Sequence, residues 1–103
     1  SKNMILSANG QNIYPEEIEA AVNNQPYVVE SVVVDRGARL VALIYMDSDK
    51  AKAEGVDLEE YKKVIMTEVN KSMPAYSKVN VVEYMTEPFA KTPKMSIKRF
   101  MYK

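Results

Sequence analysis

The sequence predicts an α+β fold: a small, mainly antiparallel three-stranded sheet with packed helices, preceded by an N-terminal two-stranded hairpin. Three observations support this prediction. Two β-branched, apolar runs flank a short turn, two other segments have apolar residues at helical spacing, and an Asn-Gly dipeptide separates two short extended pieces. A chain of 103 residues is long enough for one domain, so we expect a single domain over residues 1–103.

The first elements are a hairpin around Gly10 and a helix that begins at Pro15. Asn-Gly is a strong hairpin signal because both residues tolerate positive φ, and short extended pieces flank it at 4–6 and 11–13. Proline is favoured at the first helical position, and the acidic residues that follow complement the positive end of the helix dipole. The apolar face of this helix consists of Ile18, Ala21 and Val22.

A second, longer hairpin follows the helix. Residues 28–34 are rich in valine, which favours a strand, and residues 35–39 form a turn. The next strand, 40–46, is almost continuously apolar. We therefore expect it to be central in the sheet and covered on both faces.

The second half adds a helix, a third strand and a basic tail. Residues 47–56 are polar and predict a loop. Asp57, with Glu60 three residues later, is an acidic variant of the capping box and predicts the start of a helix. We expect the third strand at 79–84, and a basic stretch within the tail, 85–103, is expected to close as a helical turn.

The composition excludes several classes of function. The chain contains no cysteine and no histidine. This excludes thiolate zinc sites, cysteine nucleophiles and histidine general bases, so we expect neither a self-contained hydrolase nor a metal site. Any chemistry must come from Lys, Arg, Asp, Glu, Tyr or backbone groups. No apolar run approaches the ~18 residues of a membrane span.

The charges are unevenly distributed, although the 14 basic and 14 acidic residues cancel. A basic tail on an acidic body indicates an anionic partner such as phosphate, nucleic acid or a membrane surface. The alternative is a tail that is simply a solvated terminus. Residues 91–103 contain no acidic residue and five basic ones, Lys91, Lys94, Lys98, Arg99 and Lys103.

Two segments, 10–19 and 88–100, are the candidates for function. Gly10 either serves the turn alone or, by lacking a side chain, lets a ligand approach the backbone. The second segment has lysines on a proline-stiffened loop, and lysine is a point charge suited to phosphate oxygens. Aromatic residues between these lysines partly fit nucleic-acid binding instead. These residues alone therefore predict an anion-binding α+β domain.

Four motifs occur in order along the chain. They are residues 10–19 (Gly-Gln-Asn-Ile-Tyr-Pro-Glu-Glu-Ile-Glu), Pro26 with the valine-rich run 28–34, Met73-Pro74-Ala75-Tyr76, and Lys91-Thr92-Pro93 followed by Ile97-Lys98-Arg99. Together they resemble the small C-terminal domain of adenylate-forming enzymes, which include acyl-CoA synthetases, luciferases and peptide-synthetase adenylation domains. The ending 97–102 is most similar to long-chain fatty acyl-CoA ligases.

The resemblance implies the lid domain of a ligase that converts a fatty acid, ATP and CoA into acyl-CoA, AMP and diphosphate. A large N-terminal domain, absent from these residues, would bind ATP, the acid and Mg²⁺ and would be the lid's partner in cis. The lid would rotate between adenylation and thioester formation. Alone, we expect it to be inactive. We expect a cytoplasmic enzyme without a nucleic-acid partner, and peripheral membrane contact of the full-length enzyme is left open.

The resemblance also implies roles for single residues. Gly10 would lie where the coenzyme A chain passes. Lys91 and Arg99 belong to the basic tail that would meet the phosphates of ATP. Lys2 falls near the position of the hinge.

One stretch departs from the family pattern. Met95 stands where glycine is usual, and Ser96 stands where the adenylation lysine is usual. Since serine cannot supply that charge, either Lys98 or Lys94 reaches the same site, or the large domain supplies the charge, or adenylation is weak. We expect the first, which makes Lys98 and Lys94 the candidate catalytic residues.

A hypothesis of a different class stays open beside the ligase. The chain would then be a stand-alone anion- or nucleic-acid-binding interaction module with a basic C-terminal tail. A steeply salt-dependent affinity for single-stranded nucleic acid would favour this alternative.

Overall fold

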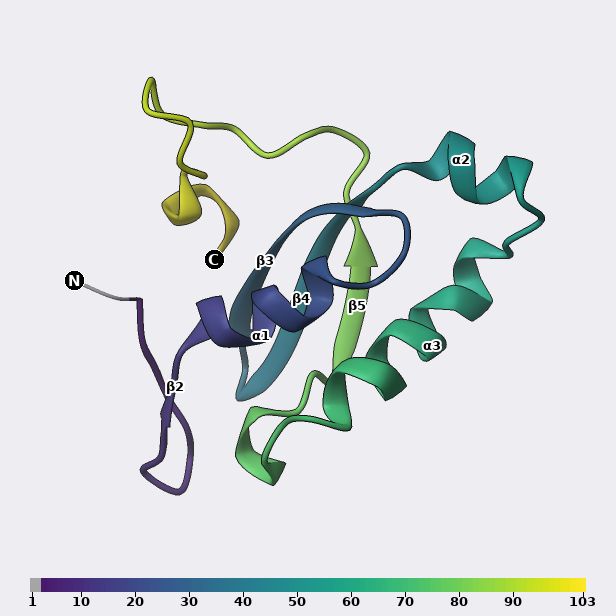
Figure 1. Cartoon of the computed structure of the whole chain (residues 1–103). Coiled ribbons are helices and arrows are strands. Elements are labelled where there is room, and N and C mark those ends of the chain that lie inside the picture. Colours follow the sequence, from purple (N-terminus) through teal and green to yellow (C-terminus); the bar gives the residue numbers. More distant parts are fainter. Residues whose placement is uncertain (1–2) are drawn as a thin grey trace.

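The computed structural model describes residues 3–103 and has an α+β fold with a two-stranded hairpin and a three-stranded sheet, as predicted (Figure 1). In chain order the elements are β1 (Ile5–Leu6), β2 (Asn12–Ile13), α1 (Pro15–Asn23), β3 (Val28–Arg36), β4 (Arg39–Met46), α2 (Ser48–Ala53), α3 (Leu58–Asn70), the 3₁₀ helix η1 (Ala75–Ser77), β5 (Val81–Tyr84) and the 3₁₀ helix η2 (Arg99–Tyr102). No helix among the described residues is long and apolar enough to cross a membrane.

The larger sheet has the strand order β3-β4-β5, so β4 is central, as expected. β3 and β4 are antiparallel, and Gly37 and Ala38 between them both have positive φ, which is typical of a tight hairpin turn. β4 and β5 are parallel, with Val41 opposite Val81. A parallel pair needs a long crossover, and α2 and α3 supply it.

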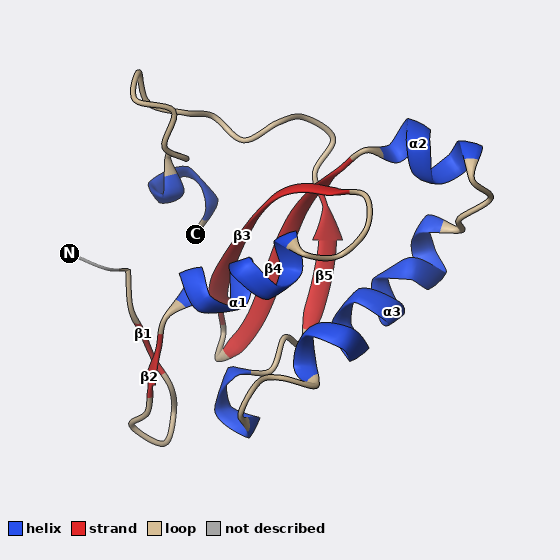
Figure 2. Cartoon of the chain, viewed as in Figure 1, coloured by secondary structure: helices blue, strands red, loops and turns tan. Residues whose placement is uncertain are grey.

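Two hydrophobic clusters cover the two faces of this sheet, whose strands are red in Figure 2. Alternate residues of β3 and β4 belong to different clusters, because side chains along a strand point to opposite faces. On one face α1 and α3 pack against the sheet through Ile18, Val22, Ile65 and Val69. On the other face the C-terminal segment packs against the sheet through Phe89, Ile97 and Tyr102. The tail that contains the basic residues therefore also covers one face of the sheet.

The prediction of a loop over residues 47–56 is wrong, because Ser48–Ala53 form the helix α2. Asp47 begins this helix: its side chain accepts a hydrogen bond from the backbone N–H of Lys50 at 3.2 Å. Gly55, with φ +82°, follows its end. The helix buries a single side chain, Ala51, so its sequence shows no apolar period.

The predicted start of α3 is confirmed at its capping residue. The Asp57 carboxylate accepts hydrogen bonds from the backbone N–H groups of Glu59 and Glu60 at 3.0 and 3.1 Å. The third strand begins at Val81 rather than at residue 79, within the usual uncertainty of strand ends. The basic tail does close as a helical turn, η2.

Candidate functional site

Residues 90–98, which we call the lysine hairpin, fold back on themselves just before η2. Lys91 and Ile97 face each other in an antiparallel bridge. The backbone N–H of Lys98 donates to the carbonyl of Ala90 at 2.9 Å, which closes the open end of the hairpin. This segment, which the sequence singled out for its charge, is thus a defined structural unit.

The tip of the lysine hairpin is built around Thr92 and Met95. The backbone carbonyl of Thr92 accepts a hydrogen bond from the N–H of Met95 at 2.8 Å. The hydroxyl oxygen of the Thr92 side chain accepts one from the N–H of Ser96 at 3.2 Å. Met95 has φ +68°, in the left-handed region that favours glycine. The turn therefore requires a left-handed backbone at the position where the family that the chain resembles usually has glycine. In this chain a methionine adopts that conformation.

Besides Lys91, the hairpin contains two more lysines, Lys94 and Lys98. Ile97 packs toward the sheet, whereas Ser96 beside it is exposed. Lys98, which is half-buried, lies in a tight turn before η2, because the N–H of Arg99 donates to the carbonyl of Ile97 at 2.9 Å. Lys94 lies in the turn itself and is exposed. Within residues 3–103 neither Lys94 nor Lys98 forms an ion pair.

The two other basic residues predicted to meet ATP are engaged inside the domain. Lys91 Nζ lies 2.8 Å from Glu30 Oε1 on β3. Arg99 makes two hydrogen bonds with Glu19 on α1, and the one from Nη1 to Oε2 is 2.8 Å long. Their charges are neutralised in this conformation, so their contact with ATP stays a prediction. Lys2, the predicted hinge residue, lies outside the described residues.

Glu19 is a charged side chain in a buried position, 5% exposed. Besides pairing with Arg99, it accepts a hydrogen bond from the backbone N–H of Val33 at 2.8 Å, on the edge strand β3. Hydrogen bonding to Glu19 raises the pKa of Arg99. Burial alone would raise the pKa of nearby Glu16, but the Asn3 amide and the charge of Arg99 lower it. Arg99 therefore stays fully charged against this acidic face of α1.

Glu19 and Glu30 are the residues that sequence reasoning missed. From the sequence, Glu19 was interpreted only as one of the acidic residues near the start of the helix. A signal was present, because Glu19 is three residues before Val22 and one after Ile18, on the buried side of an amphipathic helix. A carboxylate at such a position needs a partner. Nothing local pointed to its partner 80 residues away.

The predicted coenzyme A residue, Gly10, lies in the loop between β1 and β2. It has φ +84°, and a Cβ at this position would meet no atom within 4 Å. Its N–H donates to the carbonyl of Ser7 at 3.0 Å. The turn therefore explains the glycine by itself, and the space beside it is open for a ligand.

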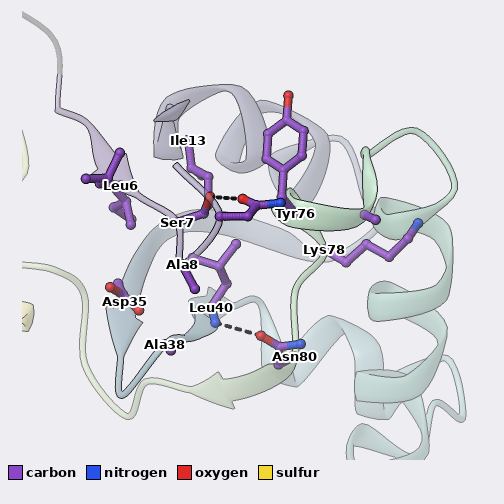
Figure 3. A pocket seen from close by; sticks show the side chains of 13 residues that line it. Leu6, Ser7, Ala8, Ile13, Asp35, Ala38, Leu40, Tyr76, Lys78 and Asn80 are labelled. Atoms are coloured by element: carbon purple, nitrogen blue, oxygen red, sulfur yellow. Dashed lines mark hydrogen bonds between the residues drawn. The ribbon is translucent and has the colours of Figure 1, made fainter. Parts of the chain in front are cut away.

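A cavity of about 500 Å³ lies beside this loop, between it, the β3–β4 turn and η1 (Figure 3). Leu6, Ile13 and Leu40 give it apolar walls, and Asp35 and Asn80 line it as polar residues. Lys78 also lines the cavity, but its ammonium group donates hydrogen bonds to the backbone carbonyls of Asn70 and Met73, at and just after the end of α3. The cavity therefore suits an uncharged polar chain better than a phosphate.

The Gly10 loop and the lysine hairpin lie at opposite ends of the molecule in Figure 1. Each would therefore meet a different part of a partner, or the same part in two orientations. Within residues 3–103 no three carboxylates come close enough together to hold a metal ion.

The fold and the two sites define the chain as a small α+β domain that presents a lysine-bearing hairpin at one end and a glycine loop at the other. Residues 2–102 match the model of the family described as AMP-binding enzyme C-terminal domain. The chain belongs to this family, which is found in adenylate-forming ligases.

Several solved structures with the same fold are acyl-CoA synthetases or CoA ligases. The acyl-CoA synthetase of Brucella canis is 26% identical, with a TM-score of 0.75 over 96% of this chain. The fatty acyl CoA synthetase of Mycobacterium tuberculosis is 23% identical, with a TM-score of 0.71 over 95% of this chain. The anthranilate CoA ligase AuaEII, in complex with anthranoyl-AMP, is 24% identical, with a TM-score of 0.80 over 97% of this chain.

This chain spans only 18% of the length of each of these three proteins. Curated protein sequences give no significant match to it.

Proposed function

We propose that the chain is the lid of an ATP-dependent acyl-CoA synthetase that acts on long-chain fatty acids. In the first half-reaction the fatty acid carboxylate attacks the α-phosphate of ATP, which forms acyl-adenylate and releases diphosphate. In the second, the thiol of coenzyme A attacks the acyl carbon and releases AMP. The lid rotates between the two, and its closure excludes water from the hydrolysable adenylate.

The observation that supports this proposal most is the lysine hairpin within a chain that matches the family from end to end. Two of its three lysines, Lys94 and Lys98, make no ion pair among the described residues, and its tip projects from the domain (Figure 1). A cation that touches the α-phosphate stabilises the charge that develops during adenylyl transfer. The lid thus brings its charge to a site that the large domain builds.

Lys98 is our first candidate for this charge, and Lys94 is the second. Lys98 is two residues from Ser96, which stands where the resemblance places the family's lysine. The flexible four-carbon stem of lysine can span much of the two-residue offset. Lys94 lies in the turn at the tip and is exposed.

The test is to measure the two half-reactions separately in the full-length enzyme. Lys98→Ala should slow acyl-adenylate formation by roughly 10²–10³, the usual effect of removing one such contact. Transfer to coenzyme A from preformed acyl-adenylate should survive. Lys94→Ala should have the smaller effect. If neither substitution slows the first half-reaction, the lysine hairpin does not act in adenylation.

The glycine loop can be tested in the second half-reaction. We expect the uncharged arm of coenzyme A to pass the Gly10 loop and its cavity, so Gly10→Ala should slow thioester formation and leave adenylation unchanged. Gly55→Ala is a matched control, because Gly55 has a similar positive φ of +82°, has open space at its Cβ and does not line the cavity. Equal effects of the two substitutions would mean that backbone strain alone is responsible.

The preference for long-chain acids rests on the ending 97–102 and on the likeness to a fatty acyl CoA synthetase. The full-length enzyme should therefore have a higher kcat/KM for long-chain than for short-chain or aromatic acids. The lid alone should form no adenylate. Efficient turnover of benzoate-like acids and not of fatty acids would contradict this assignment.

A further inference from the structure

The ion pair between Glu19 and Arg99 joins two distant parts of the chain. Glu19 lies on α1 and its side chain is only 7% exposed, while that of Arg99 is 27% exposed. Both guanidinium nitrogens Nη1 and Nη2 donate to the carboxylate, in the bidentate geometry that fixes direction as well as distance. Taking two charges out of water is costly, so such a pair is better evidence for a fixed geometry than for stability.

The carboxylate is itself fixed on its other side. The backbone N–H of Val33 donates to Glu19 Oε2 at 2.8 Å, and this strand is at the edge of the sheet. Glu19 therefore connects α1, β3 and the start of η2 at one point. Neither helix α1 nor Arg99 can shift without breaking a hydrogen bond at a buried carboxylate.

Arg99 directly follows Lys98 in the chain, so the ion pair between Arg99 and Glu19 fixes the backbone of the candidate catalytic residue Lys98 from its C-terminal side. On the N-terminal side, the N–H of Lys98 donates to the carbonyl of Ala90 at 2.9 Å. The other arm of the hairpin is attached to β3 by the ion pair between Lys91 and Glu30 at 2.8 Å. The base of the hairpin is thus anchored on both arms, while its tip is exposed.

We propose that Glu19 is a positioning residue for adenylation: through Arg99 it fixes the backbone at Lys98, so that the lysine enters the active site at a set depth and direction. This proposal rests on the function proposed above. Catalytic geometry tolerates about 0.5 Å, and a displacement of about 1 Å can cost 10²-fold in rate. Glu19 itself touches neither substrate nor Lys98, and it acts only through the guanidinium of Arg99.

The experiment uses the full-length enzyme with Glu19→Gln, and both half-reactions are measured. We expect acyl-adenylate formation to fall by about 10- to 100-fold. Thioester formation from preformed acyl-adenylate should stay within about twofold, because the lysine hairpin does not act in that step. Glu68→Gln is the matched control, because it breaks a pair with Lys71 on the exposed surface of α3 and should change neither half-reaction.

A double substitution separates positioning from general loosening of the domain. If Glu19 acts only by placing Lys98, then Glu19→Gln should slow adenylation no further once Lys98→Ala is present. Equal losses in both half-reactions, or a full additional loss in the double variant, would overturn the proposal. If Glu19→Gln does not fold, Arg99→Lys keeps the charge and loses the bidentate geometry, and the same split between half-reactions is expected.

The failure of this proposal is distinguishable from failure of the proposed function. If Lys98→Ala slows adenylation and Glu19→Gln does not, the positioning role is wrong and the function stands. If neither Lys98→Ala nor Lys94→Ala slows adenylation, the proposed role of the hairpin is wrong, and the positioning role is overturned with it.

Discussion

Replacing Met95 by glycine should stabilise the domain. Met95 has φ +68° at the tip of the lysine hairpin, and a residue with a Cβ pays about 1–2 kcal/mol for this conformation. Glycine removes that strain but loses about 0.5–1 kcal/mol through the greater freedom of the unfolded chain. Since Met95 is 72% exposed, little buried contact is lost. The net gain is therefore about 0.5–1 kcal/mol in the free energy of unfolding.

The assay is thermal and urea unfolding of this chain, followed by circular dichroism. A gain of this size should raise Tm by about 2–8 °C for a domain of ~100 residues. Met95→Ala is the control, because alanine removes the side chain but keeps the Cβ and therefore the strain. If the alanine and glycine variants raise Tm equally, backbone conformation is not the cause and the reasoning is refuted. Ala38→Gly, at φ +65° in the exposed β3–β4 turn, should give an independent gain of the same kind.

Two further predictions concern stability. Phe89 is 3% exposed, and its ring packs edge to face on that of Tyr102 with the ring centroids 5.0 Å apart. Phe89→Ala should therefore lower the free energy of unfolding, measured in urea, by about 3–5 kcal/mol. A loss under about 1 kcal/mol would mean that the C-terminal segment contributes little to the core. Burial raises the pKa of Tyr84 to about 12 from its usual 10.0, with a smaller effect of the charge on Glu59. Folding therefore favours the neutral phenol, and this contribution is complete below pH 10 and is lost as the pH rises to 12. Tyr84→Phe should consequently show a smaller alkaline loss of stability than the unmodified chain, and identical pH profiles would contradict the assignment.

Local sequence patterns predicted the elements whose signals are local. The β-branched runs, the capping residue Asp57 and the proline at the start of α1 each determine the conformation of their own neighbourhood, and the structure confirms them. The helix α2 was missed because it buries one alanine and has no apolar period. The substitution at Met95 was visible as a departure from a pattern, whereas its physical meaning, a left-handed backbone, required the structure.

Partners distant in sequence could not be predicted in the same way. The charge of the tail and the family resemblance predict that Lys91 and Arg99 meet the phosphates of ATP, and neither indicates a partner inside the domain. The structure shows that each has a carboxylate partner, 61 and 80 residues away. Which cations stay available for a ligand is therefore decided by tertiary packing, and the count of positive charges in the tail overestimates them.

The C-terminal segment also determines the order in which the core can be completed. Its contacts with β3 and β4 join residues far apart in the sequence, and closing such long loops is slow relative to the local packing of α1 on β3. We expect the helix-covered face to form first and the valine-rich opposite face to stay open until Phe89, Ile97 and Tyr102 dock. The docking that closes this face of β3 and β4 would be the same event that sets the lysine hairpin in place.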